Sequence, residues 1–410
     1  MDTAFSLYVH VPFCGIKCPY CDFNTYAAKS IPEERYVEAL LAELAFYLEQ
    51  ERWQGKRLES IYFGGGTPSL FSAHSFEKII KLITNQCSLA PSLEVTAEIN
   101  PGEISESRLA DYQAVGINRL SFGAQSLIRD QLSLLGRKHT PADVSESLER
   151  ARKLGFENCS LDLMYGLPGQ TLEDLQRDLE RFMALSPEHI SAYTLTIEEG
   201  TPFYQRYKKG MLTMPPDELV ADMMELVSEL LSRNGLRWYE VSNFALPDFE
   251  SRHNLGYWNY QSYLGLGAGA HSYLRTGKRG YRWANIAKPE AFMELVSKER
   301  SAQAWLEKLT DQEAMFEFFF LGLRKLDGVR LDEFRDLFGK EATEVYPVLL
   351  SVLEQEGFIE QQGSNLKLSK RGLLVADSVI ANFSEPEGLP ARQRDSSERM
   401  PLLPHAPNGF

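Results

Sequence analysis

Cysteine, positive charge and long apolar runs are all scarce in this sequence of 410 residues. Only five cysteines occur, and this low, odd number argues against a disulfide scaffold and for a reducing compartment. Lys and Arg number 43 against 57 Asp and Glu, and the net charge of -14 disfavours charge-driven binding to nucleic acid. No apolar run reaches the ~18 residues of a membrane span, and the N-terminus lacks the pattern of a signal peptide. We therefore expect a globular cytoplasmic protein.

Short β-branched or aromatic runs alternate with longer helical patterns over the first part of the chain. This alternation predicts repeated βα units and a parallel sheet. Six such units fit an α/β fold, a partial (β/α)6 barrel whose chemistry lies on loops at the carboxyl ends of the strands. The expected strands are residues 6–11, 60–63, 93–99, 118–122, 159–164 and 190–196, and the expected helices include residues 32–51, 75–84, 141–154 and 172–185.

Three further regions follow the expected barrel, which occupies residues 1–234. Residues 235–308 are rich in aromatic residues and glycine, and we expect them to connect the barrel to a second domain, residues 309–383. Residues 384–410 contain five prolines and no periodic pattern, and we expect this tail to be disordered. At ~150 residues per domain, the length of the chain suits this division into two or three domains.

The second domain is expected to be mainly helical. It shows three helical patterns, a hairpin around Gly363, Ser364 and Asn365, and a final helix, an outline typical of a winged helix. A winged helix that binds DNA is basic on its reading face. Between Thr310 and Phe383 the sequence instead carries 13 acidic and 8 basic residues. We therefore expect this domain to pack against the barrel or cover it, and a nucleic-acid-modifying role is disfavoured.

Three of the five cysteines lie close together, directly after the first expected strand. Cys14, Cys18 and Cys21 form the pattern C-x-x-x-C-x-x-C. Thiolates at this spacing can hold three corners of an iron–sulfur cube and leave the fourth iron open for chemistry. A structural zinc site is the alternative, but it normally takes four ligands in paired knuckles, and no second pair is present. We expect the isolated Cys87 and Cys159 to be buried, inert thiols.

A C-x-x-x-C-x-x-C loop after the first strand of a partial barrel resembles the radical S-adenosylmethionine (SAM) superfamily. This resemblance implies a [4Fe-4S] cluster whose open iron chelates the amino and carboxylate groups of the SAM methionine. It also implies that the reduced cluster cleaves SAM into methionine and a 5′-deoxyadenosyl radical. Six motifs in order resemble, more narrowly, the branch that contains oxygen-independent coproporphyrinogen III dehydrogenase: YVHVPFCGIKCPYCDF, YFGGGTPS, AEINPG, SFGAQS, LGRKH and DLMYGLPGQT.

The same resemblance implies which residues bind SAM. Glycines after the second strand let the backbone approach a ligand closely. Carboxylates suit the ribose hydroxyls or the methionine ammonium, an arginine suits the methionine carboxylate, and tyrosine rings can cover the adenine or shield the cluster. Each residue taken singly also fits a turn or a hydrogen bond at the barrel rim. The implied set is Tyr8, Tyr20, Gly65, Gly66, Thr67, Glu98, Gln125, Arg137 and Asp162, with Asn100 beside them.

Two features distinguish subgroups of this branch. The dehydrogenase carries a fourth cysteine two positions after the third ligand, where this sequence has Phe23. The motif H-N-x-x-Y-W, here residues 253–258, together with C-x-x-x-C-x-x-C-x-F resembles the heme chaperones of the branch. That likeness implies a protein that binds heme, keeps the cluster and SAM, and does not decarboxylate the porphyrin. The alternative is the dehydrogenase itself, which converts two propionates of coproporphyrinogen III to vinyl groups to give protoporphyrinogen IX.

In the heme-chaperone interpretation His253 is the candidate heme ligand, because neutral imidazole is a common axial donor. Tyr257 and Trp258 can stack on the macrocycle. The alternative for His253 is a hydrogen-bonded histidine in an aromatic patch, and His271, in the segment GLGAGAHS, is the competing ligand. The implied partners are heme, SAM, an electron donor and a recipient respiratory hemoprotein, with peripheral membrane contact only through that recipient.

Overall fold

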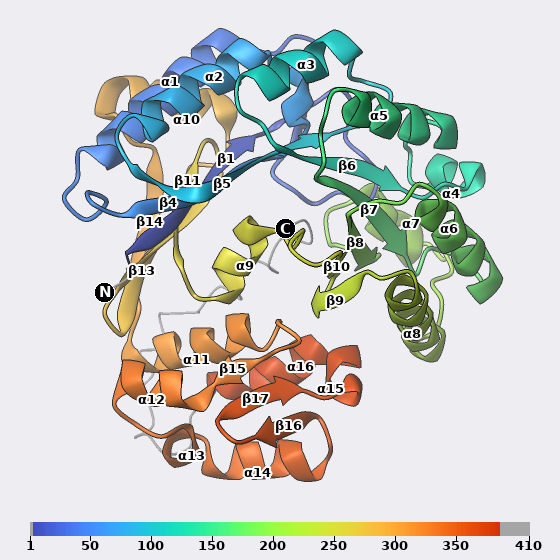
Figure 1. Ribbon diagram of the computed structural model, residues 1–410, viewed down its shortest axis with the longest axis vertical. Coiled ribbons are helices and arrows are strands. Elements are labelled where there is room, and N and C mark those ends of the chain that lie inside the picture. The colour runs from blue at the N-terminus through green and yellow to red at the C-terminus, as the bar shows by residue number, and fades with distance from the viewer. Residues whose placement is uncertain (1–2, 386–410) are drawn as a thin grey trace.

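The computed structural model describes residues 3–385. The tail that we expect to be disordered lies outside the described residues from residue 386 onward. Figure 1 shows a strongly curved, open sheet with helices on its outer face and a smaller domain beside it. Of the helices within residues 3–385, none combines the length and the apolar character that crossing a bilayer requires.

Six neighbouring parallel strands form the centre of the sheet, which confirms the predicted α/β partial barrel. Their outward side chains are buried and apolar, as in Val9, Ile61 and Leu161, because helices cover that face. A short pair, β2 (Phe13–Cys14) and β3 (Tyr26–Ala27), lies in the loop that follows the first strand. The six strands are β1 (Ala4–Val11), β4 (Arg57–Gly65), β5 (Ser88–Ile99), β6 (Arg119–Gln125), β7 (Cys159–Tyr165) and β8 (His189–Thr194).

Helices cover the convex face of these strands (Figure 1). Thr171 caps the helix that begins after it, because its hydroxyl accepts a hydrogen bond from the Asp174 backbone N–H at 3.1 Å. The Asp174 carboxylate in turn accepts from the Thr171 N–H at 3.2 Å, which completes a capping box. The helices are α1 (Glu33–Leu48), α2 (Ala73–Thr84), α3 (Glu106–Ala114), α4 (Arg129–Leu134), α5 (Pro141–Lys153), α6 (Leu172–Ala184), α7 (Pro202–Lys208), α8 (Asp217–Arg233) and α10 (Pro289–Glu299).

Residues 235–308 do more than connect two domains, because their strands extend the barrel sheet at both edges. A Cβ on Gly265 would collide with the carbonyl oxygen of His271 in the next strand, so the glycine content reflects close strand packing. β9 (Arg237–Glu240) and β10 (Asn243–Ala245) follow β8, whereas β11 (Ser262–Leu266), β12 (His271–Thr276), β13 (Arg279–Asn285) and β14 (Gln303–Lys308) follow β1 on the other side. The strand order is β14-β13-β12-β11-β1-β4-β5-β6-β7-β8-β10-β9.

The concave face of the six parallel strands is polar. Strand register places Ser6 beside Ser60 and Thr96 beside Arg119, with all four side chains buried. Helix α9 (Arg252–Trp258), which carries the H-N-x-x-Y-W motif, lies inside the arc of the sheet (Figure 1). A polar interior partly closed by a helix is suited to binding a ligand.

Residues 309–383 form a helical domain with a small three-stranded sheet, and the expected hairpin around Gly363 is present. Its core is aromatic, with Phe319 stacked on Phe383 at a centroid distance of 4.4 Å. A buried ion pair joins it to the barrel sheet, with 2.8 Å between Arg282 and Glu317. Its elements are α11 (Asp311–Gly322), β15 (Val329–Arg330), α12 (Leu331–Phe338), α13 (Ala342–Val345), α14 (Pro347–Gln355), β16 (Ile359–Gln362), β17 (Asn365–Leu368), α15 (Lys370–Leu374) and α16 (Ala376–Ala381).

Candidate functional site

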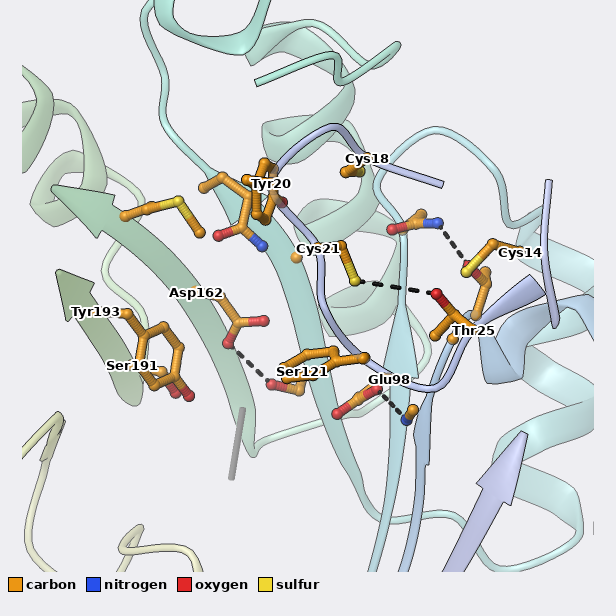
Figure 2. Close-up of a pocket in the computed structure, with 18 of the residues that line it drawn as sticks. Cys14, Cys18, Tyr20, Cys21, Thr25, Glu98, Ser121, Asp162, Ser191 and Tyr193 are labelled. Atoms are coloured by element: carbon orange, nitrogen blue, oxygen red, sulfur yellow. Dashed lines mark hydrogen bonds between the residues drawn. The ribbon is translucent and has the colours of Figure 1, made fainter. Parts of the chain in front are cut away.

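A cavity opens where the parallel strands end, at the place where the sequence predicts the chemistry. Its empty space is about 1320 Å³ when the open mouth is included. Side chains from β4 to β8 and from the loop after β1 surround it (Figure 2). The predicted residues that line it are Cys14, Cys18, Tyr20, Cys21, Gly65, Gly66, Thr67, Glu98, Gln125, Arg137 and Asp162.

The three clustered cysteines lie on the loop that connects β2 to β3. Cys14 ends β2 and is buried, whereas Cys18 and Cys21 are half-buried. Hydrogen bonds within the loop stabilise its shape. The Cys21 N–H donates to the Cys18 carbonyl oxygen at 3.2 Å, and the Lys17 ammonium donates to the Phe23 carbonyl oxygen at 2.9 Å. Burial raises the pKa of the Cys14 and Cys21 thiols. Their thiolates therefore require a compensating cation such as iron.

These donors suit an iron–sulfur cluster better than a single ion. Within residues 3–385, no three His, Cys, Asp or Glu side chains gather closely enough to hold one metal ion. The three thiols instead face the cavity from separate points of the loop (Figure 2). Thiolates are the preferred ligands of iron–sulfur clusters, and a cube presents its irons at separate corners. Cys87 and Cys159 lie outside the cavity wall.

The glycine-rich end of β4 packs directly on the cluster loop. Gly65 has a φ of 112°, a conformation that favours glycine, and its N–H donates to Glu98 Oε2 at 3.0 Å. A Cβ on Gly66 would lie 2.6 Å from the Phe13 carbonyl oxygen, and the Thr67 N–H donates to that same oxygen at 2.8 Å. Close packing against the cluster loop therefore requires these glycines, and it sets the thiols beside the predicted SAM residues.

Two carboxyl groups are enclosed in the cavity wall. Glu98 accepts a hydrogen bond from the Tyr62 hydroxyl at 2.9 Å. Burial and, as the second cause, the negative charge of Asp162 raise the pKa of Glu98 to about 8. Asp162 accepts from the Ser121 hydroxyl at 3.2 Å, and burial raises the pKa of Asp162 to about 6. A cationic ligand would favour the ionised form of both groups, so the pair suits a ligand that carries an ammonium or sulfonium.

Arg137 and Gln125 stand at the cluster end of the cavity. The Arg137 guanidinium donates to Asn100 Oδ1 at 2.7 Å and to the Gly123 carbonyl oxygen at 2.8 Å, and it lies 3.7 Å from the Cys18 sulfur. Gln125 has a φ of 64°, and its buried Oε1 has no hydrogen-bond partner among the described residues. A buried, unpaired amide oxygen in a cavity wall is suited to a hydroxyl or amine of a ligand.

The two predicted tyrosines are placed differently. Tyr20 lines the cavity and packs against Phe203 with 6.2 Å between ring centroids. Tyr8 does not reach the cavity wall: its hydroxyl lies 2.9 Å from His10 Nδ1, and its ring stacks on Tyr62 at 6.2 Å. Tyr62 takes the place in the wall that we expected for Tyr8. Tyr8 and Tyr62 are neighbours in register on the same face of the sheet, so alternation along the strands does not show which of them reaches the cavity.

His253 is fully buried, and both of its ring nitrogens are hydrogen-bonded. Nδ1 lies 2.8 Å from the Ser60 hydroxyl, and Nε2 lies 3.0 Å from the Tyr257 hydroxyl. Because the Ser60 hydroxyl itself donates to Ser6 at 2.9 Å, we assign a proton to Nδ1 and an accepting lone pair to Nε2. Burial and, as a smaller cause, the positive charge of Arg119 lower the pKa of His253 to about 3, so its imidazole is neutral.

Tyr257 and Trp258, the rings expected to stack on a macrocycle, are buried in an aromatic cluster. Tyr257 meets the His253 ring edge-on with 5.0 Å between centroids. The guanidinium carbon of Arg324 lies over the Trp258 ring, 5.6 Å from the ring centroid. Both rings are therefore enclosed by protein groups, and stacking on a macrocycle would require this cluster to open.

Two other polar residues of this region are more open to ligands. Asn254, next to His253, lines the cavity, and its buried Oδ1 has no hydrogen-bond partner among the described residues. His271, the competing heme ligand, is exposed at the start of β12, with its ring 5.8 Å from that of the 43 % exposed Trp305. His271 is therefore the accessible imidazole of the two, and His253 is the enclosed one.

Sequence reasoning missed most of the inner cavity wall. Arg119, Ser121, Ser191 and Tyr193 line it, and Figure 2 shows the last three near Asp162. The available signal was alternation, because every second residue of β6 from its first position is polar or glycine. A charged residue at the start of a strand whose other face is apolar also indicates a group held inside a barrel.

Comparisons with known proteins agree with this arrangement. Residues 8–182 match the radical SAM superfamily, and residues 309–375 match the HemN C-terminal domain. Heme chaperone HemW of Bacillus subtilis is 38 % identical over 379 residues, which cover 92 % of this chain and 98 % of that protein. Heme chaperone HemW of Haemophilus influenzae is 37 % identical over 388 residues, covering 93 % and 98 %. Coproporphyrinogen III oxidase (HemN) of Escherichia coli shares the fold, with a TM-score of 0.80 at 22 % identity over 93 % of this chain and 90 % of that chain.

The superfamily match covers the stretch that carries the three thiols and most of the cavity wall. Membership implies a [4Fe-4S] cluster and SAM, and the thiols, paired carboxyl groups and unpaired Gln125 oxygen fit both. The HemW likeness extends over nearly the full length of both proteins, through the second domain. The chain belongs to the radical SAM superfamily and, within it, to the family of proteins named heme chaperone HemW.

Proposed function

We propose that this protein binds heme and delivers it to respiratory hemoproteins, with a [4Fe-4S] cluster and SAM held in its barrel cavity. The observation that carries the proposal is Phe23, whose side chain lines the cavity two positions after Cys21. The dehydrogenase of the same branch resembles this chain but has a cysteine there. Among the described residues, only the three cluster cysteines contribute thiols to the cavity. An apolar ring at this position excludes water and supplies neither a proton nor a thiol to a substrate.

The residues of the cavity divide into groups with separate tasks. Cys14, Cys18 and Cys21 would hold the cluster, which together with SAM supplies reductive one-electron chemistry when bound. Arg137 can orient a carboxylate next to the Cys18 sulfur. Gln125 can accept a hydrogen bond from a ligand hydroxyl, since its Oε1 is otherwise unpaired within the described chain.

For heme itself we propose coordination by Nε2 of His253. The Ser60 hydroxyl fixes the ring tautomer by accepting from Nδ1, which leaves the Nε2 lone pair available for a metal. Heme would replace the Tyr257 hydroxyl on Nε2, and the aromatic cluster of α9 would open to admit it. His271 is the alternative, because its ring is already accessible beside Trp305.

Titration with ferric heme tests this proposal. We expect the wild-type protein to form a stable complex with a shifted absorption band. The band should be lost in His253→Ala and retained in His271→Ala and in the exposed control His74→Ala. Loss of the band in His271→Ala alone would assign the ligand to His271. If the wild-type protein and all three variants show only free heme, the heme-binding function is wrong.

A second experiment separates the carrier from the enzyme. Anaerobically reconstituted protein is incubated with SAM, a reductant and coproporphyrinogen III, and the products are analysed by mass. We expect unchanged substrate, and a product with two fewer carboxylates would overturn the carrier proposal. Delivery is then measured as heme transfer from loaded protein to heme-depleted respiratory membranes, with the unloaded protein and free heme as controls.

A further inference from the structure

Arg119 is a buried, charged residue of the cavity wall. It is the first residue of β6, its side chain is 2 % exposed, and it lines the cavity. Ser121 and Gln125 share its face of the strand. Arg119 begins β6 and Gln125 ends it, so the two residues belong to opposite ends of the strand. Arg137 stands beside the thiols. Burial raises the pKa of Asp162, and the positive charges of Arg119 and Arg137 both oppose this rise, so both arginines act on the same carboxyl group.

The Arg119 guanidinium lacks the partners that buried charges usually have. Its Nε has no hydrogen-bond partner within residues 3–385, and no carboxylate of that range forms an ion pair with it. Burial raises the pKa of Glu98 and of Asp162, and the positive charge of Arg119 opposes the rise in both, so these two groups are its charged neighbours. Nearby polar atoms are unpaired too, namely the Thr96 hydroxyl in the paired strand position and Asn254 Oδ1 in the cavity wall. A buried charge without a hydrogen-bonded partner is costly. Such a group persists where a ligand supplies the missing partner.

The guanidinium fork identifies the chemistry of that partner. Its planar donors match a carboxylate or a phosphate bidentately. Arg119 is also close enough to His253 for its charge to lower the pKa of that imidazole. A ligand held by Arg119 would therefore lie next to the helix that carries the proposed heme-binding histidine.

We propose that Arg119 binds a carboxylate in the cavity beside the start of β6, and that this carboxylate is a propionate of the tetrapyrrole. The identity of the carboxylate rests on the proposed heme function. The SAM methionine, the other carboxylate source, is expected at the cluster end, where Arg137 and Asn100 stand. The barrel interior would then receive a tetrapyrrole edge-first, with its acidic side chains innermost.

The test uses metal-free protoporphyrin IX, because it reports the propionates without coordination by an iron ligand. Wild-type protein, Arg119→Gln and Arg119→Lys are titrated with protoporphyrin IX and with its dimethyl ester. The 77 % exposed Arg233 supplies a matched control, Arg233→Gln. We expect Arg119→Gln to bind protoporphyrin IX ~10–100-fold more weakly, as for a charged hydrogen bond lost. Esterification should weaken wild-type binding equally and leave Arg119→Gln unaffected, and Arg119→Lys should lie between.

Several results would overturn the proposal. Equal protoporphyrin IX affinity in wild type and Arg119→Gln would remove Arg119 from the ligand site. A fall in SAM affinity of Arg119→Gln, with porphyrin binding unchanged, would assign its carboxylate to SAM instead. A large fall in the melting temperature of ligand-free Arg119→Gln, with Arg119→Lys close to wild type, would make the residue a structural counter-charge for Glu98 and Asp162. An unchanged or higher melting temperature of ligand-free Arg119→Gln supports the proposal, because an unpaired buried charge destabilises the folded protein.

Failure of the heme function can be told apart from failure of this inference. If wild-type protein binds neither heme nor porphyrin, the proposed function fails, and sodium propionate then serves as the probe. A rise in the melting temperature of wild type but not of Arg119→Gln with propionate would still support a carboxylate site. An equal rise, or none in either protein, would overturn it.

Discussion

The hydroxyl of Ser60 lies 2.8 Å from Nδ1 of His253, and both groups are completely buried. The bond joins the second strand of the barrel to the helix that carries the H-N-x-x-Y-W motif. Because Ser60 donates its own proton to Ser6, it accepts from His253 and fixes the imidazole tautomer. A serine on β4 thus determines that Nε2 faces the Tyr257 hydroxyl with a lone pair.

Tyr257→Phe tests whether that lone pair is used. The substitution removes the hydroxyl that competes for Nε2 and leaves the aromatic packing in place. If His253 is the heme ligand, we expect ~2–10-fold tighter ferric heme binding, corresponding to one hydrogen bond no longer displaced. Tyr112→Phe, which removes a buried hydroxyl bonded to the Phe71 carbonyl oxygen, is the control. Weaker binding in Tyr257→Phe would argue that the hydroxyl contacts the ligand directly.

The cluster assignment is tested by removing single thiols. We expect anaerobically prepared Cys14→Ala, Cys18→Ala and Cys21→Ala to lose the brown colour and most of the bound iron. Each variant leaves two thiolates, which cannot anchor a cube stably. Iron analysis and visible absorption measure the loss, with Cys87→Ala and Cys159→Ala as controls. Loss of iron in either control would show that the ligand set is misidentified.

The ion pair between the domains should matter for stability. Arg282 and Glu317 lie 2.8 Å apart with side chains only 16 % and 6 % exposed. Arg282→Ala leaves Glu317 buried without its partner, which typically costs ~3–5 kcal/mol. Burial raises the pKa of Glu317 to about 7, so protonation relieves part of this cost at low pH. We therefore expect a larger loss of stability at pH 8 than at pH 6.

Denaturant unfolding of the Arg282→Ala variant at both pH values measures this loss. The double variant Arg282→Met, Glu317→Leu should recover most of the stability, because neither charge remains buried. The exposed pair of Arg300 and Glu49 provides the control, and Arg300→Ala should change stability little. An effect of Arg282→Ala equal to that of Arg300→Ala would show that the interdomain pair is not sequestered from water.

Glu43 should make the stability of the protein depend on pH. It is fully buried on α1 and accepts hydrogen bonds from the Gly267 N–H at 2.9 Å and the Asn285 amide at 2.6 Å. Burial raises the pKa of Glu43 to about 8. The folded state therefore holds the proton more tightly than the unfolded chain, whose glutamates titrate near ~4.3. The stabilisation is complete below that value and is lost as the pH rises through about 8.

We expect the free energy of unfolding to fall by up to ~1.4 kcal/mol per pH unit within this window. Glu43→Gln carries no titrating group and should flatten the dependence, whereas the exposed Glu229→Gln should leave it unchanged. Denaturant titrations at several pH values from 5.5 to 8.5 provide the comparison. An identical slope in wild type and Glu43→Gln would show that Glu43 is ionised throughout.

The end of the cavity that carries the thiols could be predicted from the sequence because its residues lie in the middle or carboxyl-terminal half of a strand or in the loop after it. Parallel strands bring their carboxyl ends to one edge, so Cys14, Gly65, Glu98 and Asp162 line the same cavity. The surroundings of Arg119 could not be predicted in this way. Arg119 begins its strand and carries no motif, and its role depends on which strands close around it.

The surroundings of His253 were equally hidden in the sequence. Its partner Ser60 lies on a strand far away in the chain, and the contact exists only because α9 enters the arc of the sheet. The same holds for residues 235–308, whose short strands pair with β8 and β1 rather than with each other alone. Local periodicity indicates that such strands exist, but their neighbours are set by long-range packing.

The pairing of β1 with β11 has a consequence for how the molecule is made. Strand β1 is synthesised long before β11, so it finds one of its two neighbours only after residues 262–266 have been made. Until then, a nascent barrel that ends near residue 234 exposes unpaired strand edges on both sides, the kind of surface that recruits other chains. A fragment cut there should aggregate, whereas extension through β11 should protect the edge beside the future cluster loop.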